Sequence, residues 1–177
     1  MLLINGSNRE LNCFNILYDI KGEDDILLSL ANKEIKFCNG CNQCKAELEK
    51  KCIIDDYLSN DVYPRIIENE KILLASPLYM SNISGTLKTL IDRLYPFYNH
   101  NLLDKKHLYL ILTGQGTYED NREEIDSIIK YFEGISEWLG FDFVFLNYFT
   151  SGNSDSVKIA NDNYEELIKS IQNKLNN

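Results

Sequence analysis

Basic side chains are scarce in this chain. Lys and Arg together number 18 against 27 Asp and Glu in 177 residues, which gives a formal net charge of -9. Nucleic acids and anionic membrane surfaces are bound by clustered Lys and Arg side chains. The acidic balance therefore argues against both as partners, and we expect neither nucleic-acid binding nor membrane association.

Long hydrophobic runs and linkers are also missing. No apolar run approaches the roughly 20 residues that span a bilayer, and the apolar stretch Met1–Ile4 is too short for a secretory signal. We therefore expect a cytoplasmic protein. No Gly/Ser-rich linker, repeat or low-complexity segment interrupts the sequence, and 44% of its residues are hydrophobic. These features predict a single domain over residues 1–177.

Short apolar segments alternate with segments of helical periodicity along the whole chain. Near-continuous apolar strands are buried on both faces, as in parallel sheets covered by helices, and right-handed crossovers favour the strand order 2-1-3-4-5. The sequence thus predicts an α/β, doubly wound, five-stranded parallel sheet with helices on both faces. The expected strands are Leu2–Asn5, Ile26–Leu30, Ile72–Ala75, Leu108–Thr113 and Phe141–Phe149, and the expected helices are Asn12–Asp19, Ser59–Asn69, Ser84–Tyr95, Asp120–Leu139 and Ser156–Leu175.

In a sheet of this order, ligands bind outside the carboxyl ends of the first, third and fourth strands. After the first strand, Gly6 allows a tight turn, Ser7 and Asn12 offer short polar groups, and Arg9 offers a cation. The helix that follows presents unpaired N–H groups to an anion. The loop lacks both the Gly-Lys-Ser/Thr of a Walker A motif and G-x-G-x-x-G, so it predicts a cradle for a monophosphate.

The loop after the third strand is the most informative segment. Pro77 fixes the path of the chain out of the strand, and Tyr79 brings a planar face suited to a flat ligand. Ser84 stands where a helix N-cap is expected. The loop after the fourth strand, Thr113–Tyr118, adds further small and polar residues at the same edge. The three loops together predict one ligand site.

The segment Ser76–Arg93 resembles the NAD(P)H-dependent FMN reductase family of flavodoxin-like proteins, whose members carry Ser-Pro-x-Tyr followed by Ser-Gly-x-Leu-Lys-x-x-x-Asp-Arg. The segment Gly6–Cys13 matches the family's first motif more loosely. Asn8 stands where that family often has Pro, and Cys13 stands where it usually has a hydroxyl residue. The resemblance in layout runs over most of the chain.

This resemblance implies a flavodoxin-like fold and an FMN-dependent oxidoreductase. NAD(P)H would be the co-substrate, and a quinone, a nitro or azo compound, free flavin or a metal ion would be the acceptor. The competing interpretation is a non-catalytic electron carrier that takes electrons from ferredoxin. The implied FMN-binding residues are Ser7, Arg9, Asn12, Cys13, Pro77, Leu78, Tyr79, Met80, Asn82, Ile83, Thr113, Gly114, Gln115 and Gly116.

A second group of residues comprises Cys38, Cys41, Cys44 and Cys52. The compact C-x2-C-x2-C spacing suits iron–sulfur ligation, and it resembles the motif of iron–sulfur flavoproteins, which carry a [4Fe-4S] cluster beside FMN. Free thiols and a structural zinc site are open alternatives. Because the cysteines follow the second strand, we expect them at the same sheet edge as the flavin loops.

Two further features have plain structural interpretations. We interpret Asp55 and Asp56 as a helix cap or a solvated turn rather than a metal site. The aromatic residues near the predicted helix ends are typical of core or subunit-interface positions, and with the family resemblance they favour a homodimer. These aromatic residues are Tyr95, Phe97, Tyr98 and Trp138.

Overall fold

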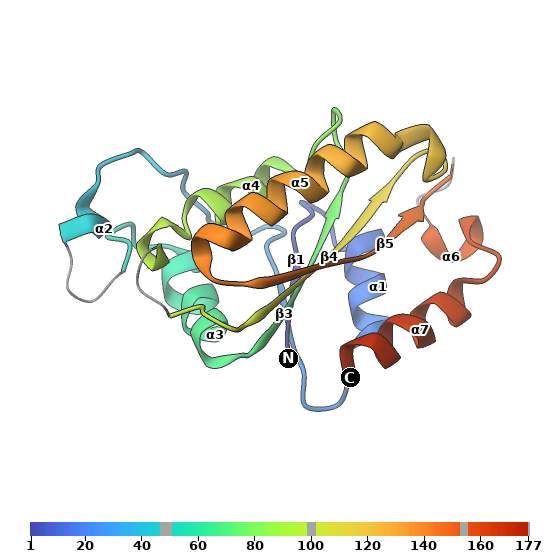
Figure 1. The fold of residues 1–177 in the computed structure, drawn as a ribbon, viewed down its shortest axis with the longest axis horizontal. Helices are drawn as coiled ribbons and strands as arrows, with labels where there is room; N and C mark the ends of the chain where they lie inside the picture. Colours follow the sequence, from blue (N-terminus) through green and yellow to red (C-terminus); the bar gives the residue numbers. More distant parts are fainter. Residues whose placement is uncertain (47–50, 99–101, 153–155, 177) are drawn as a thin grey trace.

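A computed structural model describes residues 1–46, 51–98, 102–152 and 156–176. It contains a five-stranded parallel sheet in the order β2-β1-β3-β4-β5 (Figure 1). The predicted α/β sheet and its strand order are confirmed. The strands are β1 (Leu2–Asn5), β2 (Ile26–Ser29), β3 (Lys71–Pro77), β4 (His107–Gly114) and β5 (Asp142–Thr150).

Helices connect successive strands and cover both faces of the sheet (Figure 1). The first βα unit uses α1, and the cysteine-bearing segment contains the short α2 before α3. A π-helical turn at Leu58–Val62 leads directly into α3. The helices are α1 (Asn12–Ile20), α2 (Gln43–Ala46), α3 (Tyr63–Glu68), α4 (Gly85–Asp92), α5 (Arg122–Leu139), α6 (Val157–Ala160) and α7 (Tyr164–Asn176).

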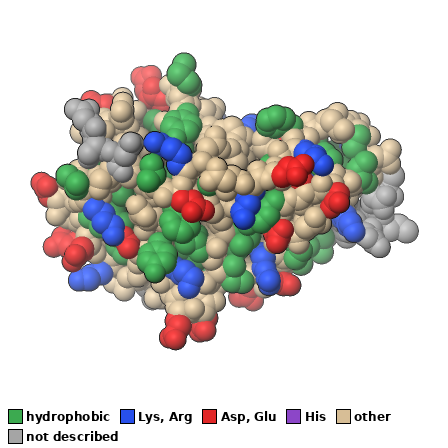
Figure 2. Space-filling model, turned by 180° about the vertical axis from the view of Figure 1, so that it is seen from behind, with side chains coloured by type: hydrophobic (Ala, Val, Ile, Leu, Met, Phe, Trp, Pro, Cys, Tyr) green, Lys and Arg blue, Asp and Glu red, His purple; other side chains and the backbone are tan. Residues whose placement is uncertain are grey.

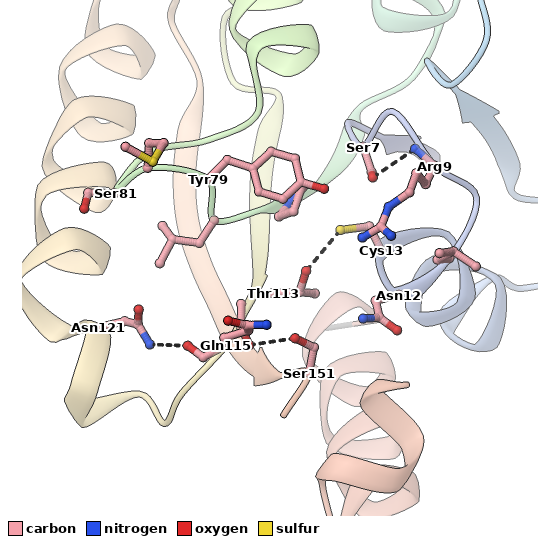
Figure 3. A pocket seen from close by; sticks show the side chains of 15 residues that line it. Ser7, Arg9, Asn12, Cys13, Tyr79, Ser81, Thr113, Gln115, Asn121 and Ser151 are labelled. Atoms are coloured by element: carbon pink, nitrogen blue, oxygen red, sulfur yellow. Dashed lines mark hydrogen bonds between the residues drawn. The ribbon is translucent and has the colours of Figure 1, made fainter. Parts of the chain in front are cut away.

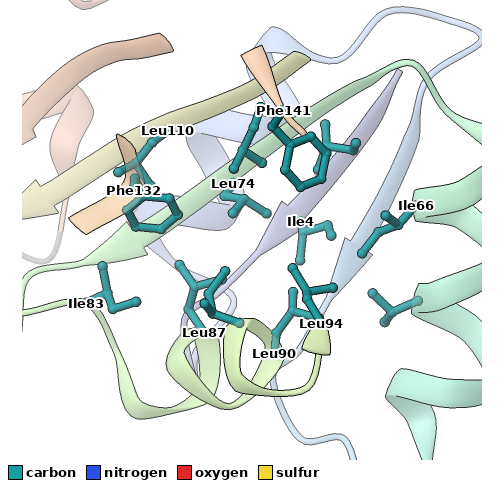
Figure 4. Packing of buried hydrophobic residues seen from close by; sticks show 14 of the residues in the cluster. Ile4, Ile66, Leu74, Ile83, Leu87, Leu90, Leu94, Leu110, Phe132 and Phe141 are labelled. Carbon is teal, nitrogen blue, oxygen red and sulfur yellow. The ribbon is translucent and has the colours of Figure 1, made fainter. Parts of the chain in front are cut away.

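Alternate residues of each inner strand point to opposite faces, as the pleat requires. Ile4 and Leu74 pack with α3, α4 and α5 in the larger core cluster, where Leu87, Leu90 and Phe132 are buried (Figure 4). The neighbouring strand residues instead join a second cluster with α1 and α7. The near-continuous apolar strands follow from this burial on both faces.

The prediction of one continuous C-terminal helix is wrong, because the structure divides this segment into two helices, α6 and α7. The Asn161 side chain donates to the Val157 carbonyl at 2.6 Å and to the Thr150 carbonyl at 2.8 Å. A short polar side chain that bonds to nearby backbone competes with helix propagation. The chain therefore turns at Asn161 before Tyr164 begins α7.

The helix predicted over Ser84–Tyr95 begins as expected but ends at Asp92. Ser84 is its N-cap, and the Ser84 hydroxyl accepts from the Leu87 amide at 3.0 Å. A short 3₁₀ turn, Tyr95–Phe97, follows the helix and contains Pro96, which cannot supply a backbone donor.

No helix in the described part of the chain is long and apolar enough to cross a membrane. Figure 2 shows Lys and Arg side chains on one face scattered between Asp and Glu side chains rather than gathered into a basic patch. This face therefore offers no concentrated positive charge.

Candidate functional site

A cavity of about 560 Å³ lies at the carboxyl edge of the sheet, where the loops after β1, β3 and β4 meet. This volume lies within the range of small-molecule and cofactor sites. The side chains that line it come from all three loops (Figure 3). The lining residues are Ser7, Arg9, Leu11, Asn12, Cys13, Pro77, Leu78, Tyr79, Met80, Ser81, Thr113, Gly114, Gln115, Asn121 and Ser151.

The loop after β1 is shaped by the buried side chain of Asn5. Its Oδ1 accepts from the Ser7 amide at 3.1 Å, and its Nδ2 donates to the Arg9 carbonyl at 3.2 Å and to Ser29 Oγ at 3.0 Å. The Ser7 hydroxyl in turn accepts from the Arg9 amide at 3.1 Å. These bonds fix the loop before any ligand is present.

Gly6 lets this loop pass close to β3 and α4. A Cβ atom at Gly6 would lie 2.9 Å from both the Ala75 carbonyl oxygen and Leu87 Cβ, closer than packed atoms allow. The Gly6 amide donates to the same Ala75 carbonyl at 2.8 Å, and the Ser84 hydroxyl donates to the Gly6 carbonyl. The first loop is therefore attached directly to the β3–α4 connection.

The N-terminus of α1 opens on the cavity without a side-chain cap. Leu11 occupies the cap position, and Leu11, Asn12 and Cys13 all line the cavity. Uncapped N–H groups at a helix N-terminus attract anions, and the Arg9 guanidinium on the same wall adds a positive charge. This end of the cavity suits a phosphate group.

Cys13 is buried beside Thr113, with 3.4 Å between Cys13 Sγ and Thr113 Oγ1. Burial raises the pKa of the Cys13 thiol to about 12, so the thiol stays protonated at neutral pH. A neutral thiol adds no negative charge to the wall that carries Arg9. The substitution of a thiol for the family's usual hydroxyl is therefore compatible with an anion here.

The loop after β3 contains a tight turn in which Tyr79 and Asn82 exchange backbone hydrogen bonds. Met80 and Ser81 at its tip have φ values of 47° and 60°, the left-handed region that non-glycine residues rarely adopt. Strained backbone of this kind clusters at ligand sites. Met80 is 98% exposed and Tyr79 is 42% exposed.

The loop after β4 is supported from β5 and α5. The Tyr148 hydroxyl donates toward the Gln115 carbonyl at 3.0 Å, and Asn121 Nδ2 donates to the same carbonyl at 2.7 Å. Burial raises the pKa of Tyr148 to about 12, so its hydroxyl remains a donor. A Cβ at Gly114 would lie 2.9 Å from the Tyr148 hydroxyl oxygen. A larger residue at this position would therefore displace the Tyr148 side chain.

The structure brings most of the predicted flavin-binding residues to this cavity. The three that do not line the cavity are Asn82, Ile83 and Gly116. Ile83 is buried in the core, and Asn82 Oδ1 accepts from the Ile83 amide. The Gly116 carbonyl lies 3.2 Å from the Tyr148 hydroxyl. The predicted residues that line the cavity are Ser7, Arg9, Asn12, Cys13, Pro77, Leu78, Tyr79, Met80, Thr113, Gly114 and Gln115.

The sequence interpretation missed four lining residues. Leu11 and Ser81 lie inside loops that were already singled out, so chain proximity could have indicated them. Asn121 and Ser151 come from the start of α5 and the end of β5, and no local motif marks them. Asn121 is held there by its bond to the Gln115 carbonyl of the same connection, whereas Ser151 is brought there by the packing of β5 beside β4.

The four predicted metal ligands, Cys38, Cys41, Cys44 and Cys52, line a separate cavity of about 360 Å³. Burial, with the nearby Cys52 and Cys41 thiols, raises the pKa of Cys44. The donor set fits a zinc ion or an iron–sulfur cluster in number and chemistry. However, no three His, Cys, Asp or Glu side chains in the described part of the chain are grouped closely enough to hold a metal ion. Ligation would require these four side chains to lie closer together.

The expected position of the cysteines is wrong. They do not lie with the flavin loops at the carboxyl edge, because this second cavity is lined by Asp92, Arg93 and Tyr95 at the far end of α4. Residues 30–36 follow β2 and lead the chain to Arg93, which holds the Lys36 carbonyl at 2.9 Å. The two cavities share no lining residue and are separated by the eight residues of α4. That length corresponds to about 12 Å.

Asp56 does serve as a cap, as predicted, because its Oδ1 accepts from the Leu58 and Ser59 amides at 3.1 and 3.3 Å. It also forms an ion pair with Arg93 that the sequence interpretation missed. Asp56 Oδ2 lies 2.6 Å from Arg93 Nη1, and neither side chain is exposed. The ion pair lies between the second cavity and the protein core.

An apolar groove of about 440 Å³ runs between α4 and α5. This groove is lined by Tyr95, Tyr98 and Trp138. Tyr95 also lines the cavity that contains the four cysteines, which we call the cysteine cavity. Phe97 is instead buried in the core. Phe97 thus occupies a core position as predicted, and the subunit-interface role of the other three aromatic residues stays a prediction.

Residues 49–175 match the family described as having the flavodoxin-like fold, and the chain belongs to that family. An iron–sulfur flavoprotein of Methanocaldococcus jannaschii is 42% identical over 77 residues, which cover 43% of this chain and 38% of the relative. An iron–sulfur flavoprotein of Archaeoglobus fulgidus is 30% identical over 104 residues, covering 57% of this chain and 46% of the relative. This chain thus spans less than half the length of these two relatives.

Solved structures share the fold over nearly the whole chain. An FMN-dependent NADH-azoreductase from Bacillus anthracis, in complex with FMN, superposes with a TM-score of 0.63 at 14% identity and covers 99% of each chain. An NADPH-quinone reductase from P. pentosaceus gives a TM-score of 0.63 at 14% identity, covering 98% of this chain and 94% of the other. At these identities, the similarity establishes the fold alone.

Proposed function

We propose that this protein is an FMN-dependent oxidoreductase that accepts reducing equivalents from NAD(P)H and passes them to a small-molecule acceptor. The observation that carries the proposal is the single cavity formed by the loops after β1, β3 and β4. The strand order has its switch point at these strand ends, where such folds bind ligands. The names of the related flavoproteins and reductases support the same cofactor.

Each wall of the cavity has a distinct task in this proposal. Arg9, Ser7 and the first turn of α1 hold the phosphate. Tyr79 and the Pro77–Leu78 segment face the planar ring from one side, and Gly114 with Gln115 faces it from the other. Bound FMN would supply hydride and electron transfer, while the protein supplies position and access. No side chain is required as a nucleophile.

Flavin binding is tested by fluorescence titration of the apoprotein with FMN and riboflavin. We expect stoichiometric FMN binding and markedly weaker riboflavin binding, because riboflavin lacks the phosphate that the first loop would hold. Equal affinities would contradict the assignment of the phosphate site.

The electron donor is tested by stopped-flow bleaching of bound FMN under anaerobic conditions. Bleaching by NADH or NADPH supports the reductase. Fast reduction by reduced ferredoxin, with no reduction by either nicotinamide, supports an electron carrier instead. The observation that favours the electron carrier is the arrangement of four cysteines around one cavity.

We further propose that Cys38, Cys41, Cys44 and Cys52 hold a [4Fe-4S] cluster. Anaerobic reconstitution should give about four irons per chain. Cys41→Ser should abolish this iron uptake, whereas Cys13→Ser should leave it unchanged. Tight binding of one zinc would indicate a structural site, and binding of neither metal would indicate free thiols.

We propose a homodimer that buries the apolar groove between α4 and α5. Tyr95 and Trp138 are 43% and 67% exposed on this groove, and aromatic residues are enriched where subunits meet. Light scattering should give twice the chain mass of 20.5 kDa at micromolar concentration. A monomer under those conditions would contradict the proposal.

A further inference from the structure

Arg93 is wholly buried although it carries a positive charge. Its two terminal nitrogens lie 2.6 and 3.1 Å from the two carboxylate oxygens of Asp56. Burial alone would lower the pKa of Arg93, but the hydrogen bonds to Asp56 outweigh this effect and raise it. Both side chains therefore remain charged, and two-point pairing of this kind fixes orientation as well as distance.

The same two side chains bind both ends of the segment that carries the four cysteines, between Lys36 and Ile54. We call this segment the cysteine loop. Arg93 Nη1 donates to the Lys36 carbonyl at 2.9 Å, and Asp56 Oδ2 accepts from the Lys36 amide at 2.9 Å. Arg93 Nη2 donates to the Ile54 carbonyl at 3.2 Å. Cys38 and Cys52 each lie two residues from one of these held positions. The ion pair thus fixes where the loop enters and leaves the body of the protein.

Within the described residues 38–46, the hydrogen bonds are local, and Lys45 Nζ also lies 5.5 Å from the centroid of the Tyr95 ring. The hydrogen bonds formed by side chains and turns in the described residues 38–46 join Asn39 with Cys41, Gly40 with Asn42, and Asn42 with Lys45. Gly40 and Asn42 both have positive φ values, which allow sharp bends. The bonds from Arg93 and Asp56 therefore act at Lys36 and Ile54, close to the first and the last of the four cysteines.

One donor on Arg93 remains without a partner. Its Nε is buried and has no hydrogen-bond acceptor among the described residues, although Arg93 lines the cysteine cavity. A buried polar group without a partner is uncommon and costly in a folded protein. Burial of Arg93 at this cavity therefore carries a cost that its bonds to Asp56, Lys36 and Ile54 offset.

We propose that Arg93 and Asp56 are positioning residues for the cysteine cavity: their ion pair anchors both ends of the loop so that its four thiols can bind a metal centre. This inference rests on the proposed role of the cysteines as ligands. It is separate from flavin binding, because the flavin cavity contains neither residue.

The test compares metal binding in the wild type, Arg93→Lys and the double variant Asp56→Leu/Arg93→Met. Replacing a buried ion pair with apolar residues is often neutral for stability, so the double variant is expected to fold. Retained FMN binding confirms that it does. The surface pair Arg65–Glu68, converted to Arg65→Met/Glu68→Leu, provides a matched control. Each protein, purified anaerobically without metal, is titrated with Co²⁺, whose thiolate absorption bands report sulfur ligation.

We expect Co²⁺ affinity to fall at least tenfold in the double variant and to stay within twofold of wild type in the control. Arg93→Lys should be intermediate, because lysine can pair with Asp56 but cannot reach the Lys36 and Ile54 carbonyls in the same geometry. Wild-type affinity and wild-type absorption bands in the double variant would overturn the proposal while leaving the cysteines as ligands.

If the wild type binds neither Co²⁺ nor iron, the cysteines are not metal ligands. The proposal that Arg93 and Asp56 position them for a metal then fails too. Limited proteolysis then separates the anchoring of the loop from its ligand role. Faster cleavage between Lys36 and Asp56 in the double variant supports the anchoring, and an unchanged cleavage rate refutes that as well.

Discussion

The two cavities at opposite ends of α4 are built in different ways. The flavin cavity is formed by loops that leave adjacent parallel strands, and each loop is held by several bonds from buried groups such as Asn5, Ser84 and Tyr148. The cysteine cavity is formed by one long excursion of the chain, anchored at its ends by Asp56 and Arg93. A site assembled from strand ends inherits its geometry from the sheet, whereas the buried Asp56–Arg93 ion pair is central to the anchoring of the second site.

The strongest test of this comparison removes one partner of the buried pair. Asp56→Ala leaves the Arg93 charge buried without compensation and should lower the free energy of unfolding by about 3–5 kcal/mol. Urea denaturation measures the loss. Glu68→Ala removes an exposed ion pair and should cost less than about 1 kcal/mol. Similar losses in the two variants would show that the ion pair does not stabilise the fold as described.

Lowering the pH should reduce the stability that Asp56 contributes, because its carboxylate becomes protonated. Burial alone would raise the pKa of Asp56, but the hydrogen bonds from Arg93 and the Lys36 amide outweigh it, and the net pKa lies below the usual 3.8. The unfolded state thus binds the proton more readily, so this contribution is present above about pH 4 and is lost as the pH falls through the lower folded value. The stability difference between wild type and Asp56→Asn should shrink below pH 4. A difference that grows there would contradict the assignment.

At the flavin cavity, the largest single-residue effect should come from Arg9. Arg9→Ala should weaken FMN binding by about 1.5–3 kcal/mol, the range for a hydrogen bond to a charged group. Riboflavin binding should change little, because it lacks the phosphate. Arg122→Ala, which removes an exposed ion pair with Glu119, is the control. Equal losses for FMN and riboflavin would place Arg9 away from the phosphate.

Ser84 tests how firmly the flavin loops are joined to one another. Its hydroxyl caps α4 and donates to the Gly6 carbonyl, while its amide donates to Ser76 Oγ at 3.0 Å. Ser84→Ala should lower the free energy of unfolding by about 1–2 kcal/mol through loss of the cap. FMN affinity should also fall, because the first loop loses its attachment. Unchanged FMN affinity would show that the first loop keeps its geometry without the bond from Ser84.

The smallest expected effect concerns the turn after β3. Ser81→Gly should stabilise the protein by about 0.5 kcal/mol, because relief of the left-handed backbone slightly exceeds the added chain entropy of glycine. Thermal unfolding measures the gain, and Ser151→Gly, whose serine also lines the cavity, is the control. Destabilisation by Ser81→Gly would show that its 3.3 Å contact with Glu124 outweighs the strain.

Much of the fold and of the flavin cavity was determined by the sequence itself. Periodic apolar segments specify strands buried on both faces, and the parallel order then brings the carboxyl ends of β1, β3 and β4 together. Because these loops stay next to their strands, Ser7, Arg9, Tyr79 and Gln115 could be assigned to one site before the structure was known. The Ser84 cap was predictable for the same reason, since it acts on its own helix.

Only the tertiary structure decided the remaining features. Ser151 reaches the flavin cavity through packing between β4 and β5, which no local pattern encodes. Arg93 and Asp56 lie 37 residues apart in the chain, and their pairing moves the cysteine loop from the expected sheet edge to the far end of α4. A long connection can follow many paths at similar entropic cost, so its position depends on the contact that anchors it.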